Sequence, residues 1–245
     1  MNLETASLTA RGGRAKNEDA CGWTAVGGLT AWVVADGLGE QWAGEIASRL
    51  AVQSFIFAFW HGPSLAAEDL REYVARADGD LKEWQAEQRT ALRMGSTIVA
   101  AVSHGRWLRS VHLGDSRFYW FRDNKVLLHS KDHSVPQSLC EAGIIGPEEI
   151  RSHPHRDILL LGLGGSQTPE PTVSPEGELR AGDALLLCTD GFWRSLTEAD
   201  MERELARTAG ASEWLGRMET LRRENARSLR DDDNYTAIAV RVGED

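Results

Sequence analysis

Long apolar segments are missing from this sequence, and none reaches the roughly 18 residues that a membrane-spanning helix requires. The N-terminus also lacks the basic and apolar regions of a secretory signal peptide. Cysteine is scarce: Cys21, Cys140 and Cys188 are widely spaced and form no C-x-x-C pair, which argues against a disulfide framework or a zinc knuckle. We therefore expect a soluble cytoplasmic protein with no membrane contact.

Positive charge is in the minority, because 27 Lys and Arg residues face 37 Asp and Glu residues and leave a formal net charge of -10. No cluster of Lys or Arg forms a stripe that could follow a phosphate backbone, so nucleic acid is not expected as a partner. An anionic substrate would need a site that reverses the local field. Bound divalent cations can do this.

Carboxylates are abundant, and three of them directly follow apolar, strand-like segments. Asp36 follows residues 29–35, Asp115 follows residues 111–114, and Asp190 follows residues 184–189. A charge at the end of a buried strand is costly unless it is paired or bound to a cation. Several such charges in one chain predict a multivalent metal site built from hard oxygen ligands.

The apolar and β-branched runs predict strands at 30–35, 96–103, 107–113, 118–122, 126–129, 184–189 and 236–242. Gly105 and Asp123-Asn124 fall where hairpin turns would lie, so we expect residues 96–129 to form one antiparallel meander. Apolar residues at helical spacing predict helices over 43–58, closed by Gly62-Pro63, and at 70–84, 198–209 and 213–228, the third of the four capped by Thr197. Helix pairs between runs of strands favour an α+β fold of antiparallel sheets covered by helices, and we expect one domain over residues 1–245.

Several short motifs occur in one order along nearly the whole chain. They are Arg14-x-x-Asn17-Glu18-Asp19, Val33-Val34-Ala35-Asp36-Gly37-Leu38-Gly39, Gly44-Glu45-x-Ala47-Ser48, Gly95-Ser96-Thr97, Gly114-Asp115-Ser116-Arg117, Asp132-His133-Ser134, Leu185-Leu186-Leu187-Cys188-Thr189-Asp190-Gly191 and Asp233-Asn234-x-Thr236. Each motif alone is weak. Together and in this order they resemble the PPM (PP2C) family of metal-dependent serine/threonine protein phosphatases, in its short bacterial form. The resemblance implies a four-layer α/β/β/α sandwich with a site for two Mn²⁺ or Mg²⁺ ions at one edge.

The resemblance also implies ligands for these ions. Asp36 would bridge the two metals, with the Gly37 carbonyl as a further ligand, because glycine lets the backbone approach closely. Glu18 would bind one metal, and Asp190 and Asp233 would hold the other. Asp115 matches the residue that, with Asp190, binds a third and weaker ion in bacterial relatives.

The implied reaction is hydrolysis of phosphoserine and phosphothreonine monoesters in proteins by a hydroxide that bridges the two metals. Asp36 and Asp19 would act with Arg14, Asp19 by orienting metal-bound water and Arg14 by binding phosphoryl oxygens through its planar fork. The implied partners are phosphorylated proteins and a cognate serine/threonine kinase, opposed in bacterial signalling. We expect the chain to act as a monomer.

Two residues depart from the family pattern. Leu38 stands where many animal members have histidine and bacterial members often have methionine, and it cannot act as a general acid. Glu40 stands where glycine is common and adds negative charge near the metals. The segment between Ser134 and Gly182 corresponds to the family's variable flap, which transfers least from one member to another.

Simpler interpretations stay open at several positions. Asp36-Gly37 could be an ordinary turn, Asp115 could form an ion pair with Arg117, and Arg14 could be a solvated side chain. His133 is expected to make a structural polar contact, and His153-Pro154-His155 is expected to be a loop.

Two other functions remain: a catalytically silent fold that binds phosphoproteins or a kinase, and a partner-switching phosphatase acting on anti-sigma-factor antagonists. The motif at residues 14–19 favours the kinase-opposing branch.

Overall fold

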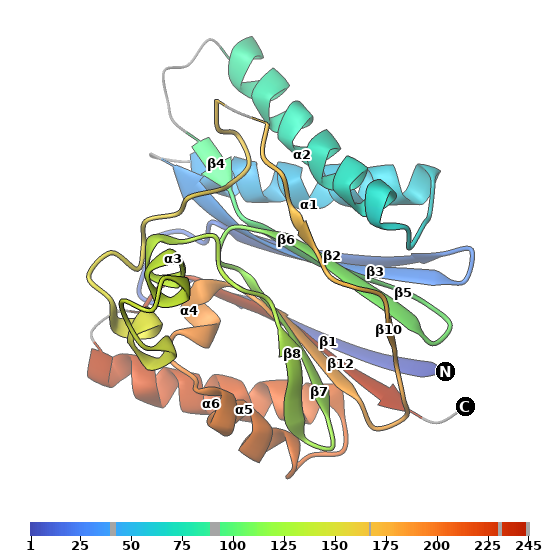
Figure 1. Ribbon diagram of the computed structural model, residues 1–245, viewed down its shortest axis with the longest axis vertical. Helices are drawn as coiled ribbons and strands as arrows, with labels where there is room; N and C mark the ends of the chain where they lie inside the picture. Colours follow the sequence, from blue (N-terminus) through green and yellow to red (C-terminus); the bar gives the residue numbers. More distant parts are fainter. Residues whose placement is uncertain (40–42, 89–93, 167, 230–231, 244–245) are drawn as a thin grey trace.

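A computed structural model describes residues 1–39, 43–88, 94–166, 168–229 and 232–243. Two antiparallel sheets lie face to face, and helices cover the outer face of each (Figure 1). Helices α1 (Ala43–His61) and α2 (Ala67–Glu87) cover one sheet, and α5 (Glu198–Leu205) and α6 (Ala211–Leu229) cover the other. The predicted α+β class and the four-layer sandwich are confirmed.

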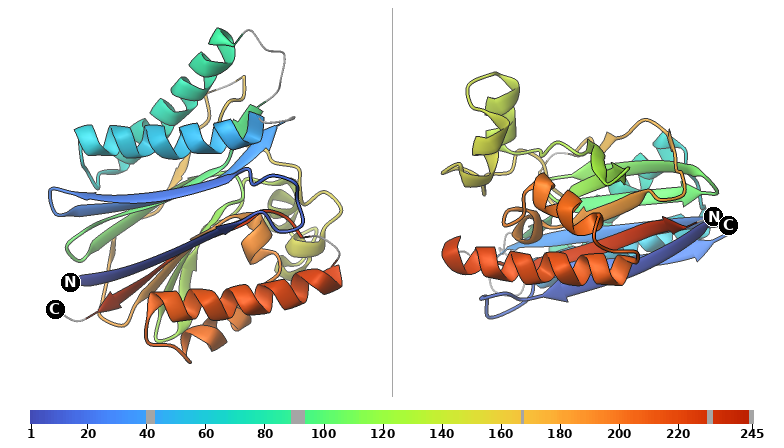
Figure 2. Two further views of the ribbon diagram at one scale, coloured as in Figure 1. Left: turned by 180° about the vertical axis from the view of Figure 1, so that it is seen from behind. Right: turned by 90° about the horizontal axis from the view of Figure 1, so that it is seen from below.

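The first sheet joins strands from both ends of the chain in the order β1-β12-β11-β7-β8. Its strands are β1 (Asn2–Ala10), β12 (Tyr235–Gly243), β11 (Ala184–Cys188), β7 (Arg117–Arg122) and β8 (Lys125–His129). Strands β1 and β12 pair along their full length, so the two chain ends lie side by side (Figure 2).

The second sheet has the order β10-β6-β5-β3-β2, with two short additions, β4 on β3 and β9 on β6. Its strands are β10 (Gly177–Glu178), β6 (Trp107–Leu113), β5 (Ile98–His104), β3 (Leu29–Gly39), β2 (Asp19–Val26), β4 (Met94–Ser96) and β9 (Thr172–Val173). The remaining short helices are α3 (Val135–Glu141), the 3-10 helix η1 (Pro147–Ser152) and α4 (Asp190–Trp193).

Three apolar layers hold the sandwich together. One lies between the sheets and includes the fully buried Trp32 and Ile238. The second packs α1 and α2 on β3 and β5, and the third packs α5 and α6 on β11 and β12. Because β3 and β11 are buried on both faces, they read as continuous apolar runs rather than as alternating ones.

The predicted meander over residues 96–129 is wrong. The hairpin turns are as expected, with positive φ at Gly105, Asp123 and Asn124. However, β5 and β6 belong to one sheet while β7 and β8 belong to the other. The chain crosses between the sheets at Gly114, whose φ of 101° suits glycine. This crossing places Asp115 at an edge shared by both sheets.

Two further differences concern strands. Asp36 does not end its strand, because β3 continues to Gly39 and pairs with β4 there. Strands β1 and β2 were not predicted, since their alternating, half-buried residues lack a strongly apolar run. Within the part of the chain that the structure describes, no helix is long and apolar enough to cross a bilayer.

Candidate metal centre

A cavity of about 220 Å³ lies where the two sheets meet. Seven of the eight site residues predicted from the sequence line it: Arg14, Glu18, Asp36, Gly37, Asp115, Asp190 and Asp233. They come from β3, the crossing between β6 and β7, the start of α4, and the loops before β2 and β12. This edge is the end of the sandwich far from the chain termini (Figure 1). Acids from five separate segments thus surround one small space.

Hydrogen bonds fix the backbone of Asp36 in the middle of this edge. Its N–H donates to Thr97 Oγ1 at 2.9 Å. Its carbonyl accepts from the Thr97 N–H at 2.9 Å and from Ser96 Oγ at 2.9 Å. Asp19 on β2 lies directly opposite Asp36 in the strand register. Both backbone polar groups of Asp36 are therefore satisfied, and its side chain is left for the cavity.

Close backbone packing brings Glu18 and Gly37 together. The Gly37 N–H donates to the Glu18 carbonyl at 3.0 Å, and the Glu18 N–H donates to Asn234 Oδ1 at 2.8 Å. A Cβ added to Gly44 would lie 2.9 Å from the Gly37 oxygen and 3.0 Å from Glu18 Oε1. The carbonyl oxygen and the carboxylate therefore gather beside Gly44, where a side chain would occupy the space between them.

Asp190 and Asp233 are placed by the packing of two turns. A Cβ on Gly191 would lie 2.0 Å from the Asn234 carbonyl oxygen, so only glycine allows this approach. Arg222 on α6 joins the turns, because its Nε donates to the Gly191 carbonyl at 2.9 Å and its Nη2 donates to the Asp233 carbonyl at 3.1 Å. Arg222 was not predicted from the sequence. The one feature that could have pointed to it is a positively charged residue on the apolar face of a predicted helix.

The carboxylates are close enough to perturb one another strongly. Burial raises the pKa of Asp36 well above its usual range, and the charges of Asp19, Asp190 and Asp115 add to the shift. Burial, followed by the charge of Asp190, likewise raises the pKa of Asp115 well above its usual range. Such a cluster calls for protons or cations to neutralise it.

The donor set fits divalent cations with hard-ligand preference. Every acid on the cavity wall offers oxygen, as the Gly37 carbonyl does, and oxygen is the ligand that Mn²⁺ and Mg²⁺ favour. Nonetheless, in the described ranges no three Asp, Glu, His or Cys side chains already stand in position around one ion. Ion binding would therefore draw the carboxylates toward a common point. Arginines hold some of them now: Arg14 Nη2 lies 2.8 Å from Asp233 Oδ2, and Arg194 Nη2 lies 2.7 Å from Asp190 Oδ2.

Asp19 is the predicted site residue that does not line the cavity. It is buried beside Asp36 on the neighbouring strand, and its Oδ2 accepts a hydrogen bond from Thr189 Oγ1 at 2.9 Å. Its Oδ1 has no hydrogen-bond partner in the described part of the chain. Burial raises the pKa of Asp19 to about 7. This buried oxygen could accept a hydrogen bond from a water molecule bound to a cation in the cavity. The water-orienting role of Asp19 stays a prediction.

The partner of Asp115 differs from the one considered from the sequence. Arg117 forms a buried pair with Asp132, with Nε 2.7 Å from Oδ1. Asp115 faces Arg194 instead, at 3.5 Å between Oδ2 and Nη2. Sequence reasoning missed Arg194, because nothing in its neighbourhood distinguishes it from a surface arginine at the end of a short helix.

The mouth of the cavity is formed by Leu38, Gly39 and two residues of the flap segment, Asp157 and Leu159. Leu38 is 41% exposed and carries no ionisable group. Glu40, the other departure from the family pattern, lies outside the described residues. Among the cavity-lining residues that the structure describes there is no histidine.

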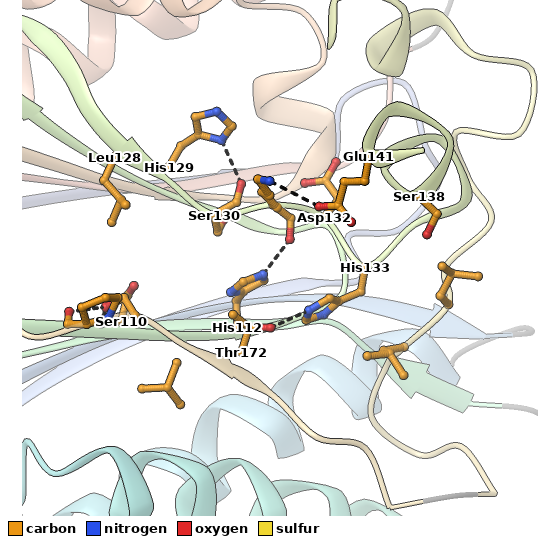
Figure 3. A pocket seen from close by; sticks show the side chains of 16 residues that line it. Ser110, His112, Leu128, His129, Ser130, Asp132, His133, Ser138, Glu141 and Thr172 are labelled. Atoms are coloured by element: carbon orange, nitrogen blue, oxygen red, sulfur yellow. Dashed lines mark hydrogen bonds and ion pairs between the residues drawn. The ribbon is translucent and has the colours of Figure 1, made fainter. Parts of the chain in front are cut away.

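His133 makes structural contacts, as predicted. Its Nδ1 accepts from the Gly114 N–H at 3.2 Å, and its Nε2 lies 2.9 Å from Thr172 Oγ1. Its ring stacks on His112 at 4.7 Å in the wall of a second cavity of about 520 Å³, whose lining includes none of the eight predicted site residues (Figure 3). His153 and His155 lie in a loop, where the His155 N–H donates to His153 Nδ1.

Comparison with known proteins places these features in a family. Residues 10–225 match the family model for protein phosphatase 2C. Serine/threonine protein phosphatase PstP of Mycobacterium tuberculosis is 36% identical over 180 residues, which cover 73% of this chain but only 34% of that relative. Serine/threonine phosphatase stp of Listeria innocua is 31% identical over 215 residues, covering 85% of this chain and 82% of the relative.

Solved structures agree with the sequence relatives. The catalytic domain of PstP, crystallised in complex with 2 manganese ions, is similar with a TM-score of 0.83 and 28% identity, and 99% of each chain is covered. Stp1 from Staphylococcus aureus has a TM-score of 0.88 and 26% identity, covering 100% of this chain and 96% of that one. Since the family match also extends over most of the sequence, this chain belongs to the protein phosphatase 2C family.

Proposed function

We propose that this protein is a Mn²⁺- or Mg²⁺-dependent phosphatase that hydrolyses phosphoserine and phosphothreonine monoesters in proteins. The observation that carries the proposal is the gathering of acids from five chain segments around one cavity, with Asp36 at its centre. The names of the bacterial relatives support the same reaction. The partners would be phosphorylated proteins and a serine/threonine kinase whose action the enzyme opposes in the cytoplasm, and the chain would act as a monomer.

The wall of the cavity supplies both the ion ligands and the substrate contact. When bound, a pair of divalent cations activates the attacking water and neutralises the phosphoryl charge. Asp36, Glu18 and the Gly37 carbonyl would hold one ion. Asp36, Asp190 and Asp233 would hold the other. Asp19, buried beside Asp36 on the neighbouring strand, would orient metal-bound water.

Arg14, which lines the cavity, would receive the phosphoryl group. Its side chain is 58% exposed and touches Asp233, so the planar fork can turn toward two phosphoryl oxygens. Leu38 offers no proton, and no histidine is among the described residues of the wall. The proton for the departing serine or threonine oxygen therefore comes from water.

Release of inorganic phosphate from a phosphothreonine peptide tests the proposal directly. We expect turnover with Mn²⁺, none after EDTA, and recovery when Mn²⁺ is restored. A wild-type protein that binds Mn²⁺ but turns over no phosphopeptide would contradict it. Such a result would favour the catalytically silent, phosphoprotein-binding fold.

Metal removal should also change stability. Acids that repel one another in the metal-free protein are bridged when ions bind the folded state only. At about 100 times the dissociation constant this adds roughly 2.7 kcal/mol, so we expect Tm to be roughly 5–10 °C higher in Mn²⁺ than in EDTA. Differential scanning calorimetry in Mn²⁺ and in EDTA measures this difference in Tm. Identical melting curves in Mn²⁺ and EDTA would contradict the shared site.

Substitution of Arg14 should separate substrate binding from metal binding. Loss of a charged donor to the phosphoryl group should lower kcat/KM by roughly 100-fold in Arg14→Ala, and by less in Arg14→Lys, which keeps the charge but not the fork. Mn²⁺ stoichiometry should not change in either variant. Arg11→Ala is the matched control, because Arg11 is exposed and its hydrogen bonds to Arg14 and Asn234 are accepted by its backbone carbonyl, which the substitution keeps. An Arg14→Ala enzyme with wild-type kcat/KM would remove Arg14 from the substrate site.

A further inference from the structure

Arg194 lies directly after α4 with its guanidinium between two acids of the cavity. Its side chain is 10% exposed. Nη2 lies 2.7 Å from Asp190 Oδ2 and 3.5 Å from Asp115 Oδ2. Asp190 in turn lies close enough to Asp36 for its charge to act on that carboxyl. Asp190 therefore stands between the predicted bridging ligand on one side and an arginine on the other.

Asp115 and Asp190 are the pair that the family resemblance assigns to a third, weaker ion. In this chain a permanent positive charge occupies the space between them. A guanidinium is not deprotonated in proteins and presents N–H donors to both carboxylates. Any cation placed there would meet these donors rather than free oxygen lone pairs. The residues present therefore do not fit a third ion.

We propose that the Arg194 guanidinium takes the place of a third divalent cation, so that this centre binds two ions and no third. The inference rests on the proposed two-ion site and specifies its stoichiometry. This would distinguish the chain from bacterial relatives in which the residue at the position of Asp115 binds a third ion. Here Asp115 is a counter-charge for Arg194, and Arg194 is a positioning residue for Asp190.

Contacts on the far side of the guanidinium hold it in place. Nη1 donates to Asp157 Oδ1 at 2.6 Å, and Nη2 donates to the Arg156 carbonyl at 3.1 Å. Asp115 is itself fixed, because Trp193 Nε1 donates to its carbonyl at 2.9 Å. To admit an ion, the Arg194 guanidinium would have to leave three carboxylates and a carbonyl together, with its charge still partly buried. Such displacement is costly.

The same contacts join the flap to the metal centre. Arg156 and Asp157 belong to the segment that follows η1, while Asp190 begins α4 and Arg194 directly follows it. One side chain thus connects the cavity wall with the segment at its mouth. Loss of Arg194 should loosen residues 155–160 as well as free Asp115.

Isothermal titration of EDTA-stripped protein with MnCl₂ tests the proposal. We expect two ions per wild-type chain and three per Arg194→Ala chain, the third with the weakest affinity. The double variant Arg194→Ala with Asp115→Asn should return to two, because one carboxylate of the third site is gone. Arg194→Lys should also bind two, because the ammonium keeps the charge between the acids.

Amide hydrogen exchange of the flap tests the positioning role of Arg194 separately, because a change in the number of bound ions alone would not alter it. In Arg194→Lys, amides of residues 155–160 should exchange roughly tenfold faster, since the contacts to Arg156 and Asp157 are lost while the charge remains. Three ions in the wild-type protein, or two in a folded Arg194→Ala protein, would overturn the proposal. If Arg194→Ala does not fold, the wild-type and Arg194→Lys stoichiometries still decide it. Failure of the proposed phosphatase function would look different: no Mn²⁺ bound, or two ions bound without turnover.

Discussion

Replacing Asp36 with asparagine should abolish metal-dependent turnover and, at the same time, raise the Tm of the metal-free protein. Loss of a residue that only supports a metal ligand typically costs about 10–100-fold. Loss of a ligand common to two ions should therefore reduce kcat/KM by more than about 100-fold. The stability gain arises because asparagine keeps the shape of the side chain but removes its charge from the acid cluster.

The pH dependence of this gain follows from the raised pKa of Asp36. Burial and the neighbouring acids keep this carboxyl protonated in the folded state at pH values where it ionises in the unfolded chain, above its ordinary value of 3.8. Stability that is present below that pH is therefore lost as pH rises. Asparagine does not titrate, so the Asp36→Asn protein and the wild-type protein should melt alike near pH 4 and diverge toward neutral pH.

Thermal unfolding of both proteins in EDTA across this pH range measures the effect, with an expected difference of about 1–3 kcal/mol at neutral pH. Asp80→Asn is the control, because Asp80 lies on α2 and pairs with Arg76 at 2.8 Å, away from the cavity. That variant should keep wild-type turnover and show no growing difference in Tm. A metal-free Asp36→Asn protein that is less stable than the wild type at neutral pH would show that the acids do not repel one another there.

Much of the sandwich could be predicted from apolar patterning. Strands buried on both faces, such as β3 and β11, stand out because each contains a nearly continuous apolar run, and α1 shows a face at helical spacing. Strands β1 and β2 have one half-exposed face, and their stability comes from partners far away in the chain. Local sequence carries little of that information, so these strands were missed.

The allocation of strands to sheets was not predictable from periodicity. The segments β5–β6 and β7–β8 are each a hairpin, and a single meander is the simplest continuation of two consecutive hairpins. The outcome depends on the crossing at Gly114, where a Cβ would lie 2.7 Å from the Thr97 side chain. That close contact belongs to the folded sandwich, and no local pattern shows it.

The acids of the site could be named from the sequence because their positions are marked by motifs. The cations that accompany them could not. Arg222 is identified only when α6 is seen to deliver it to the Gly191 and Asp233 carbonyls. Arg194 is identified only when Asp115 and Asp190, separated by 75 residues in sequence, are seen on either side of it. The arginines that compensate the charge of these acids are brought to them by the fold, so they can be identified only from the structure.

Gly37→Ala should be among the most damaging single-methyl substitutions in this chain. The added Cβ would lie 2.0 Å from the Gly44 carbonyl oxygen and 2.5 Å from the Glu18 carbonyl oxygen. Both are backbone atoms, so β3 and the Glu18 loop must separate. We expect a loss of about 3 kcal/mol, or roughly 6–12 °C in Tm, together with loss of tight Mn²⁺ binding, because the Gly37 carbonyl and Glu18 would move apart.

Gly79→Ala provides the opposite case with the same chemical change. Gly79 is exposed inside α2, and a Cβ there would meet nothing within 4 Å. Alanine should therefore stabilise the helix by about 0.5–1 kcal/mol and leave Mn²⁺ affinity and turnover unchanged. Calorimetric melting and Mn²⁺ titration of both variants measure the contrast. If Gly37→Ala kept wild-type Mn²⁺ affinity, the Gly37 carbonyl could not be a ligand, because the substitution cannot be accommodated without moving the backbone that carries it.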